Sequence, residues 1–183
     1  MKLIGVLLFS IFSIFSIFSI FSIFAVDTAV AQDSVPFDTY GYVVDPAEPV
    51  DPEWLAYCLS EGFNTGFQGT RVGTAKHLGN YIETERGCLD FSLFPIVQSR
   101  NIEGVFVAAN GDELYYTSEA NFDFLNPPEI IWGTFEFVGG TGRFENASGA
   151  GEVQDIGVGA SGAVLRLVGE ISYDASDRRK SGD

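Results

Sequence analysis

The chain has 183 residues, of which 25 are acidic and 10 basic, giving a formal net charge of −15. This charge excludes nucleic acid and anionic membrane surfaces as partners, because both are polyanions. No Asp-x-Asp-x-Asp-Gly loop accompanies the acidic residues, so we predict a solubilising charge on an exported protein, with no metal site and no cofactor.

The first 31 residues have the pattern of a secretory signal peptide. A short basic start, Met1-Lys2, precedes an uncharged run from Leu3 to Val26, much of it a Phe-Ser-Ile repeat. Ala29-Val30-Ala31 then supplies the small residues that a signal peptidase reads. We expect cleavage before Gln32 and a secreted or periplasmic protein. An uncleaved membrane anchor is the alternative, because the run exceeds the roughly 20 residues that span a bilayer.

Residues 32–65 are expected to form an N-terminal extension with one short helix. Proline recurs up to Pro52, which favours extended or irregular structure. The segment "DPEWLAYCLS" then predicts a helix, with Asp51 as N-cap, Pro52 at the first helical position and Gly62 just beyond the end.

The two cysteines, Cys58 and Cys88, predict a disulfide. An even pair in an exported chain usually pairs. Neither cysteine belongs to a Cys-x-x-Cys motif, and His77 is the single histidine, so a metal or redox site is disfavoured.

Residues 66–175 are expected to form a β-barrel, followed by a disordered tail over residues 176–183. In "GTRVGTAKHLGNYIET", period-two alternation places Arg71, Gly73, Ala75, His77 and Tyr81 on one face. A face this rich in small residues suits the concave side of a strongly curved sheet.

The clearest hairpin signal is Asn110-Gly111 in "VFVAANGDELYYT". This dipeptide favours a two-residue turn in which both residues have positive φ. Such a turn pairs Val107 with Leu114 and Val105 with Tyr116 on one face, and Phe106 with Tyr115 on the other.

The glycine-rich corner at Gly139, Gly140 and Gly142 raises the question of a phosphate-binding loop. No lysine and no long helix follow it, as a P-loop or a dinucleotide fingerprint requires. We therefore interpret these glycines, like Asn110 and Gly111, as structural turn residues. About eight short strands with one helix predict an all-β fold, a single antiparallel eight-stranded β-barrel, with a sandwich as the alternative.

Two segments carry a family resemblance. "FEFVGGTGRFENASGAGEV" resembles a strand–turn–strand of the allene oxide cyclase and dirigent-like (calycin-like) β-barrels, and "GTRVGTAKHLGNY" resembles the opening strand of exported bacterial proteins of that type. The resemblance, over roughly residues 66–173, implies an antiparallel eight-stranded barrel that is often a homo-oligomer. It also implies an apolar small molecule in the lumen, whose cyclisation or coupling the barrel guides by its shape. No family catalytic residue aligns with a position here.

Five side chains are candidates for lining such a lumen: His77, Tyr81, Tyr116, Trp132 and Glu136. His77 could be a general base or a hydrogen-bonded structural residue. Glu136 could be a carboxylate in an aromatic-lined cavity or a solvent-facing strand residue. Both faces of most strands carry apolar residues, so the pattern does not decide which face points inward.

Two functions remain open. In the first, the barrel binds an apolar small molecule in its lumen, with cyclase-like activity as an option. In the second, the barrel is filled by its own side chains and is a non-catalytic structural or interaction module. The large aromatics Phe91, Phe106, Phe135 and Phe137 favour a filled interior, whereas the resemblance favours a cavity.

Overall fold

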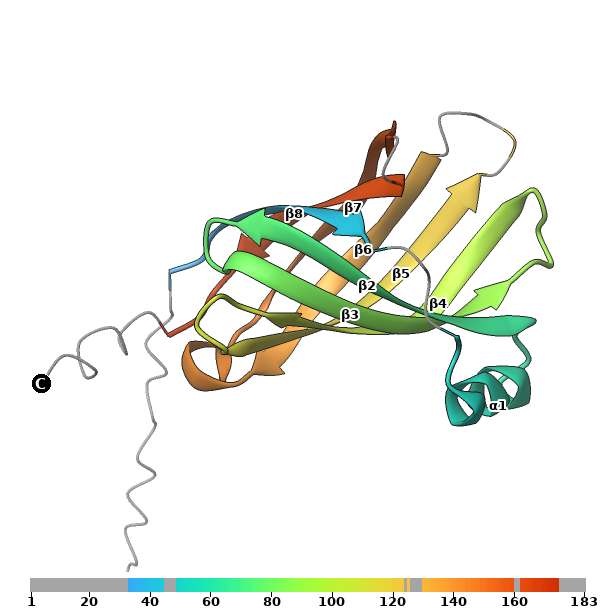
Figure 1. Ribbon diagram of the computed structural model, residues 1–183, viewed down its shortest axis with the longest axis horizontal. Coiled ribbons are helices and arrows are strands. Elements are labelled where there is room, and N and C mark those ends of the chain that lie inside the picture. The colour runs from blue at the N-terminus through green and yellow to red at the C-terminus, as the bar shows by residue number, and fades with distance from the viewer. Residues whose placement is uncertain (1–32, 45–48, 124, 126–129, 160–161, 175–183) are drawn as a thin grey trace, which may run out of the picture. The chain divides into compact units, whose positions relative to one another are not determined.

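Eight antiparallel strands form a closed barrel in the computed structural model of the protein (Figure 1). The structure describes residues 33–44, 49–123, 125, 130–159 and 162–174. Each strand pairs with the next along the chain, and β8 pairs with β1 to close the barrel. The strands are β1 (Val35–Val43), β2 (Thr65–Ala75), β3 (Gly79–Asp90), β4 (Ile96–Val107), β5 (Glu113–Asp123), β6 (Ile130–Gly140), β7 (Gly149–Gly159) and β8 (Gly162–Ile171). The predicted all-β fold is confirmed.

The barrel begins earlier in the chain than the sequence pattern predicts. β1 lies in the stretch that was expected to be irregular, and it pairs with both β2 and β8. Pro36 stands near the start of this strand, and no proline follows until after Val43, so the pairing continues without interruption. Phe37 and Thr39 point inward and are 1% and 0% exposed.

The short helix α1 (Pro52–Ser60) forms where it is predicted. The Asp51 carboxylate accepts hydrogen bonds from the backbone N–H of Glu53 at 2.8 Å and of Trp54 at 3.0 Å. Cys58 forms the expected disulfide with Cys88 of β3, with 5.4 Å between the two Cα atoms. The disulfide therefore fastens the helix to the barrel wall.

The β4–β5 hairpin forms, but its predicted register is wrong by one residue. Val107 pairs with Glu113, Val105 with Tyr115, and Gly104 with Tyr116. The loop has three residues instead of two, because Ala108 donates its N–H to the carbonyl oxygen of Asp112 at 2.9 Å. Gly111 has a φ of 87° whereas Asn110 stays in the ordinary region, as expected when a left-handed residue closes a three-residue loop.

The segment "GTRVGTAKHLGNYIET" is a hairpin and not one continuous strand. β2 ends at Ala75 and β3 starts at Gly79, so the period-two face continues only as far as Ala75. Leu78 turns inward at this connection and is 1% exposed.

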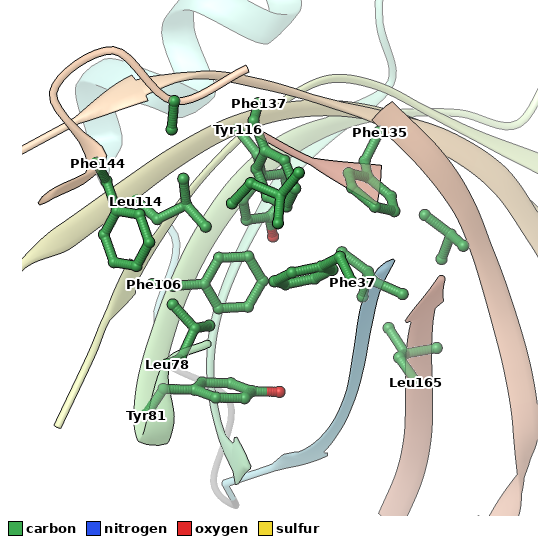
Figure 2. Close-up of a cluster of buried hydrophobic side chains, with 14 of the residues drawn as sticks. Phe37, Leu78, Tyr81, Phe106, Leu114, Tyr116, Phe135, Phe137, Phe144 and Leu165 are labelled. Atoms are coloured by element: carbon green, nitrogen blue, oxygen red, sulfur yellow. The ribbon is translucent and has the colours of Figure 1, made fainter. Parts of the chain in front are cut away.

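One end of the barrel is closed by an aromatic plug: Phe37, Tyr81, Phe106, Phe135, Phe137 and Phe144, with Leu78 and Leu114 (Figure 2). Phe37 lies amid this plug, with its ring centroid 4.8 Å from that of Phe137 and 6.1 Å from that of Phe106. The glycine corner supplies Phe144 through the 3₁₀ turn η1 (Gly142–Phe144), and Gly139 and Gly142 have φ values of 111° and 55°. The corner thus seals this end of the lumen.

The expected signal peptide, its cleavage before Gln32 and the tail over 176–183 lie outside the described residues. Within the described ranges, no helix has the length and apolar character needed to cross a bilayer.

Loss of the Cys58–Cys88 disulfide should lower the free energy of unfolding by roughly 3–4 kcal/mol, the chain-entropy value for a loop of this length. Urea unfolding of the wild type with and without reductant would measure the change. The double variant Cys58→Ala/Cys88→Ala is the control, and reductant should not change its stability. Equal stability of the oxidised and reduced wild type would contradict the prediction.

Candidate functional site

A cavity of about 200 Å³ occupies the lumen beyond the aromatic plug. Its walls are mostly apolar and come from all eight strands, and the apolar wall residues include Val43, Phe67, Ile102, Ala120, Phe122, Ile131, Val153 and Leu165. Four polar side chains complete the lining: Arg71, Glu85, Tyr116 and Ser118. The interior is therefore packed with side chains at one end and hollow toward the other.

The polar part of the lining is built around Arg71 and two carboxylates. The guanidinium donates to Glu83 through Nε at 2.9 Å and Nη2 at 2.5 Å. It also donates to Glu85 through Nη1 at 2.7 Å and Nη2 at 2.6 Å. The side chains of Arg71, Glu83 and Glu85 are 7%, 1% and 15% exposed, so both ion pairs are shielded from water.

Tyr116 joins the same network from β5, two strands away from β3 in the barrel. Its hydroxyl donates to Glu83 Oε1 and lies 3.3 Å from Glu85 Oε2. We refer to Arg71, Glu83, Glu85 and Tyr116 as the lumen ion cluster.

Strand register brings the lumen ion cluster together. Arg71 of β2 stands directly opposite Glu83 of β3, and Glu85 follows two residues later on the same inward face. Two glycines then leave room around Glu85, since Gly69 and Gly104 are its partners on the two neighbouring strands. A Cβ at Gly104 would come within 2.1 Å of the Tyr116 ring, whereas a Cβ at Gly69 would meet no atom within 4 Å.

Burial and neighbouring charge shift the pKa values of this cluster. Desolvation, together with the negative charge of Glu83, raises the pKa of Glu85, although Arg71 opposes the shift. Desolvation and the two carboxylates also hold the pKa of the Tyr116 hydroxyl well above 10. Desolvation alone would lower the pKa of Arg71, but Glu83 and Glu85 outweigh it, and the guanidinium stays charged. The cluster is therefore neutral when Glu85 is protonated and carries one negative charge when it is not.

The five predicted lining residues lie in four different places. Tyr116 lines the cavity. Tyr81 is in the plug, where its hydroxyl accepts a hydrogen bond from Thr39 at 2.6 Å and burial raises its pKa to about 12. His77 is in the β2–β3 connection, with Nδ1 2.9 Å from the Tyr173 hydroxyl and Nε2 3.0 Å from the Pro36 carbonyl. It does not reach the cavity.

Trp132 and Glu136 do not line the lumen, because they are exposed on the outer face of β6. The buried residues of this strand are Ile131, Phe135 and Phe137, so alternation turns the even-numbered neighbours outward.

The sequence pattern did not single out Glu83, Glu85 or Ser118. A signal for the carboxylates exists in "YIETER", where Tyr81, Glu83 and Glu85 alternate with Ile82 and Thr84. The apolar Ile82 suggests the reverse orientation, yet Ile82 is 53% exposed and the glutamates are inside. Only the partner Arg71, on the small-residue face of β2, makes the true orientation favourable.

The end of the barrel away from the plug has an apolar rim. Leu93 and Phe94, in the β3–β4 connection, are 58% and 64% exposed, and Leu125, after β5, is 64% exposed. The helix α1 lies at this same end, as Figure 1 shows, with the η1 turn at the other. Within the described ranges, no three His, Cys, Asp or Glu side chains are grouped so as to hold a metal ion.

No protein-family model matches the chain, and no curated protein matches it significantly. Among solved structures, the chain is similar to the pterocarpan synthase dirigent protein GePTS1. The TM-score is 0.45 and the sequence identity 17%, over 78% of this chain and 89% of that chain. A likeness this distant concerns the barrel and carries no activity across. The resemblance to allene oxide cyclases and the bacterial source stay predictions.

Replacing Glu85 with glutamine should remove the part of the pH dependence of the free energy of unfolding that comes from the Glu85 carboxyl group. A raised pKa means that the folded protein keeps a proton that the unfolded chain loses above about pH 4.5. The wild-type free energy of unfolding should therefore fall, relative to that of Glu85→Gln, as pH rises from this value to the folded-state pKa. The expected slope is at most about 1.4 kcal/mol per pH unit.

Urea unfolding between about pH 4 and pH 8 would measure this difference. Glu136→Gln, on the outer face of the barrel, is the matched control and should parallel the wild type. A constant difference between the wild type and Glu85→Gln across this range would contradict the prediction.

Proposed function

We propose that the protein binds a small, mostly apolar molecule in the hollow half of its barrel. The observation that carries the proposal is the cavity of about 200 Å³, with apolar walls and one polar cluster. Binding sites for small molecules usually have this composition, because apolar contact supplies affinity while a few polar groups fix orientation. A barrel serving only as a structural module would have no need for a buried ion cluster beside an unfilled space.

The arrangement of the polar groups supports a binding role. Burying a guanidinium and two carboxylates costs free energy that an apolar core of the same volume would avoid. Arg71 and Glu85 nevertheless lie on the cavity wall, where they can contact a ligand. If these side chains were placed within the plug, they would contact no ligand and could have only a structural role.

Cyclase-like chemistry is a second candidate, and Glu85 supports it. Its raised pKa favours the protonated carboxyl group, which could donate a proton to a ligand in the cavity. In this case Glu85→Gln would bind the ligand but would not turn it over, and single-turnover product analysis would separate the two steps. Equal turnover by the variant would exclude Glu85 as the acid.

We also infer that the protein is exported. The Cys58–Cys88 disulfide supports this inference, since disulfides persist mainly in oxidising compartments.

Filling the cavity should abolish ligand binding without unfolding the protein. Ala120 is 3% exposed and lies on the cavity wall, so Ala120→Leu would place three extra carbon atoms in the space that a ligand needs. Native mass spectrometry of protein purified from its own host should show a bound small molecule on the wild type and none on the variant. In isothermal titration, the wild type should likewise bind 1-naphthalenemethanol and the variant should not.

Ala150→Leu is the matched control, because Ala150 is exposed on the outer face of β7. It should bind as the wild type does. A wild type that carries no molecule and does not bind 1-naphthalenemethanol would contradict the proposed function, as would equal binding by the two leucine variants.

A further inference from the structure

The lumen ion cluster has more negative than positive groups. One guanidinium, Arg71, faces the two carboxylates of Glu83 and Glu85, and all three side chains are at least 85% buried. Among the described residues that line the cavity, Arg71 is the single cation. When both glutamates are ionised, one negative charge inside the barrel is therefore left without a balancing positive charge.

The hydrogen-bond donors of the cluster are already engaged. Four of the five guanidinium N–H groups of Arg71 are directed at the two carboxylates. The Tyr116 hydroxyl donates to Glu83, and the Ser118 hydroxyl donates to the Thr134 carbonyl at 2.9 Å. A ligand in the cavity therefore meets mainly acceptors, and it must bring a donor of its own.

Glu85 is the acceptor that a ligand can reach. Its side chain is the more exposed of the two carboxylates, and it lines the cavity whereas Glu83 does not. Its cross-strand neighbour Gly69 leaves open space beside it, since no atom lies within 4 Å of a Cβ built there. Gly69 does not itself line the cavity; the open space beside it belongs to a groove that Gly69 and Glu85 share with Arg86 and Glu103. Glu85 thus has room beside it for a small cationic group.

We propose that the lumen selects apolar molecules bearing a single protonated amine, with the ammonium group against Glu85, and that it disfavours carboxylates. This inference rests on the proposed function. The ammonium supplies the missing positive charge and donates to the available acceptor. A neutral alcohol can donate a hydrogen bond to the same acceptor but brings no charge, and a carboxylate adds a second excess negative charge. Where Glu85 holds a proton before binding, that proton passes to solvent as the ammonium takes its place.

Four probes of one shape would test the selectivity by isothermal titration at about pH 7: 1-naphthylmethylamine, 1-naphthalenemethanol, 1-methylnaphthalene and 1-naphthoate. The amine should bind at least about tenfold more tightly than the alcohol, the usual gap between a charge-assisted and a neutral hydrogen bond. Methylnaphthalene should bind more weakly than the alcohol, and naphthoate most weakly of all.

Glu85→Gln should remove the preference for the amine while keeping the binding of methylnaphthalene, because the amide preserves shape but not charge. Glu136→Gln, on the outer face, is the matched control and should keep the wild-type order. Should Glu85→Gln not fold, titration of the wild type at a series of pH values from about 4.5 upward gives a second readout. The affinity for the amine should rise with pH as Glu85 ionises, and the affinity for methylnaphthalene should not.

The outcomes separate this inference from the function on which it rests. If the alcohol and methylnaphthalene bind but the amine is no tighter than the alcohol, or naphthoate is the tightest, the amine selectivity is wrong and lumen binding stands. If none of the four probes binds, both proposals fail. An amine preference that Glu85→Gln retains would also overturn the inference, because the preference would then arise elsewhere.

Discussion

The hollow half of this barrel is organised by one constraint, the permanent charge of a buried arginine. A guanidinium cannot shed its proton in a protein, so Arg71 must be surrounded by acceptors wherever it is buried. Glu83 stands opposite it across the β2–β3 pair, and Glu85 reaches it from the next inward position. Tyr116 of β5 donates a hydrogen bond to Glu83, and Gly104 of β4 leaves room for the Tyr116 ring. Removing the guanidinium would leave two buried carboxylates without a positive charge, which is a larger penalty than losing a single contact, whereas removing Glu85 would leave a balanced Arg71–Glu83 pair.

The two ends of the barrel differ in how completely side chains fill the lumen. At the plug end, aromatic rings from β1, β3, β4, β6 and the η1 turn interlock, and Phe37, Phe106 and Phe144 are at most 1% exposed. At the other end, mostly apolar side chains and the polar groups of Arg71, Glu85, Tyr116 and Ser118 surround a cavity that they do not fill. The interior is therefore filled by side chains at one end and hollow at the other. Phe106, Phe135 and Phe137 are buried as a filled interior predicts, but Phe91, which was grouped with them, is 40% exposed. The plug contributes apolar burial that can offset the cost of the buried ions.

The features that the sequence predicted correctly are those decided over a few neighbouring residues. The Asp51 cap, the helix after it and the existence of the Asn110-Gly111 hairpin are all local. The Cys58–Cys88 pair is long-range, but two cysteines allow only one intramolecular pairing. The hairpin register depended on whether Ala109 joined the loop or the strand, that is, on whether Asp112 lies opposite Ala108 or Ala109, and composition does not reveal this difference.

The site was only partly predictable, because the closed barrel as a whole decides which face of each strand points into the lumen. Ile82 is apolar and faces solvent, whereas Glu83 is charged and 1% exposed. A strand considered alone would favour the opposite choice. Placing Glu83 inside and Ile82 outside is favourable only because Arg71 is the cross-strand partner of Glu83. That pairing depends on a register set by both strands together. For the same reason, Trp132 and Glu136 were plausible lining residues until β6 was placed with Ile131 and Phe135 inside.

The plug closes one end of the lumen in the part of the chain that the structure describes. If a ligand binds as we propose, it would leave toward the other end, and one molecule would have to depart before the next could bind. Its residence time would then depend on its passage through that end as well as on its fit to the cavity. Leu93, Phe94 and Leu125 lie in the strand connections at that end, each with more than half of its surface exposed. The proposed ligand would pass these apolar side chains last on its way to solvent, so changes to these three residues should alter residence time more than fit.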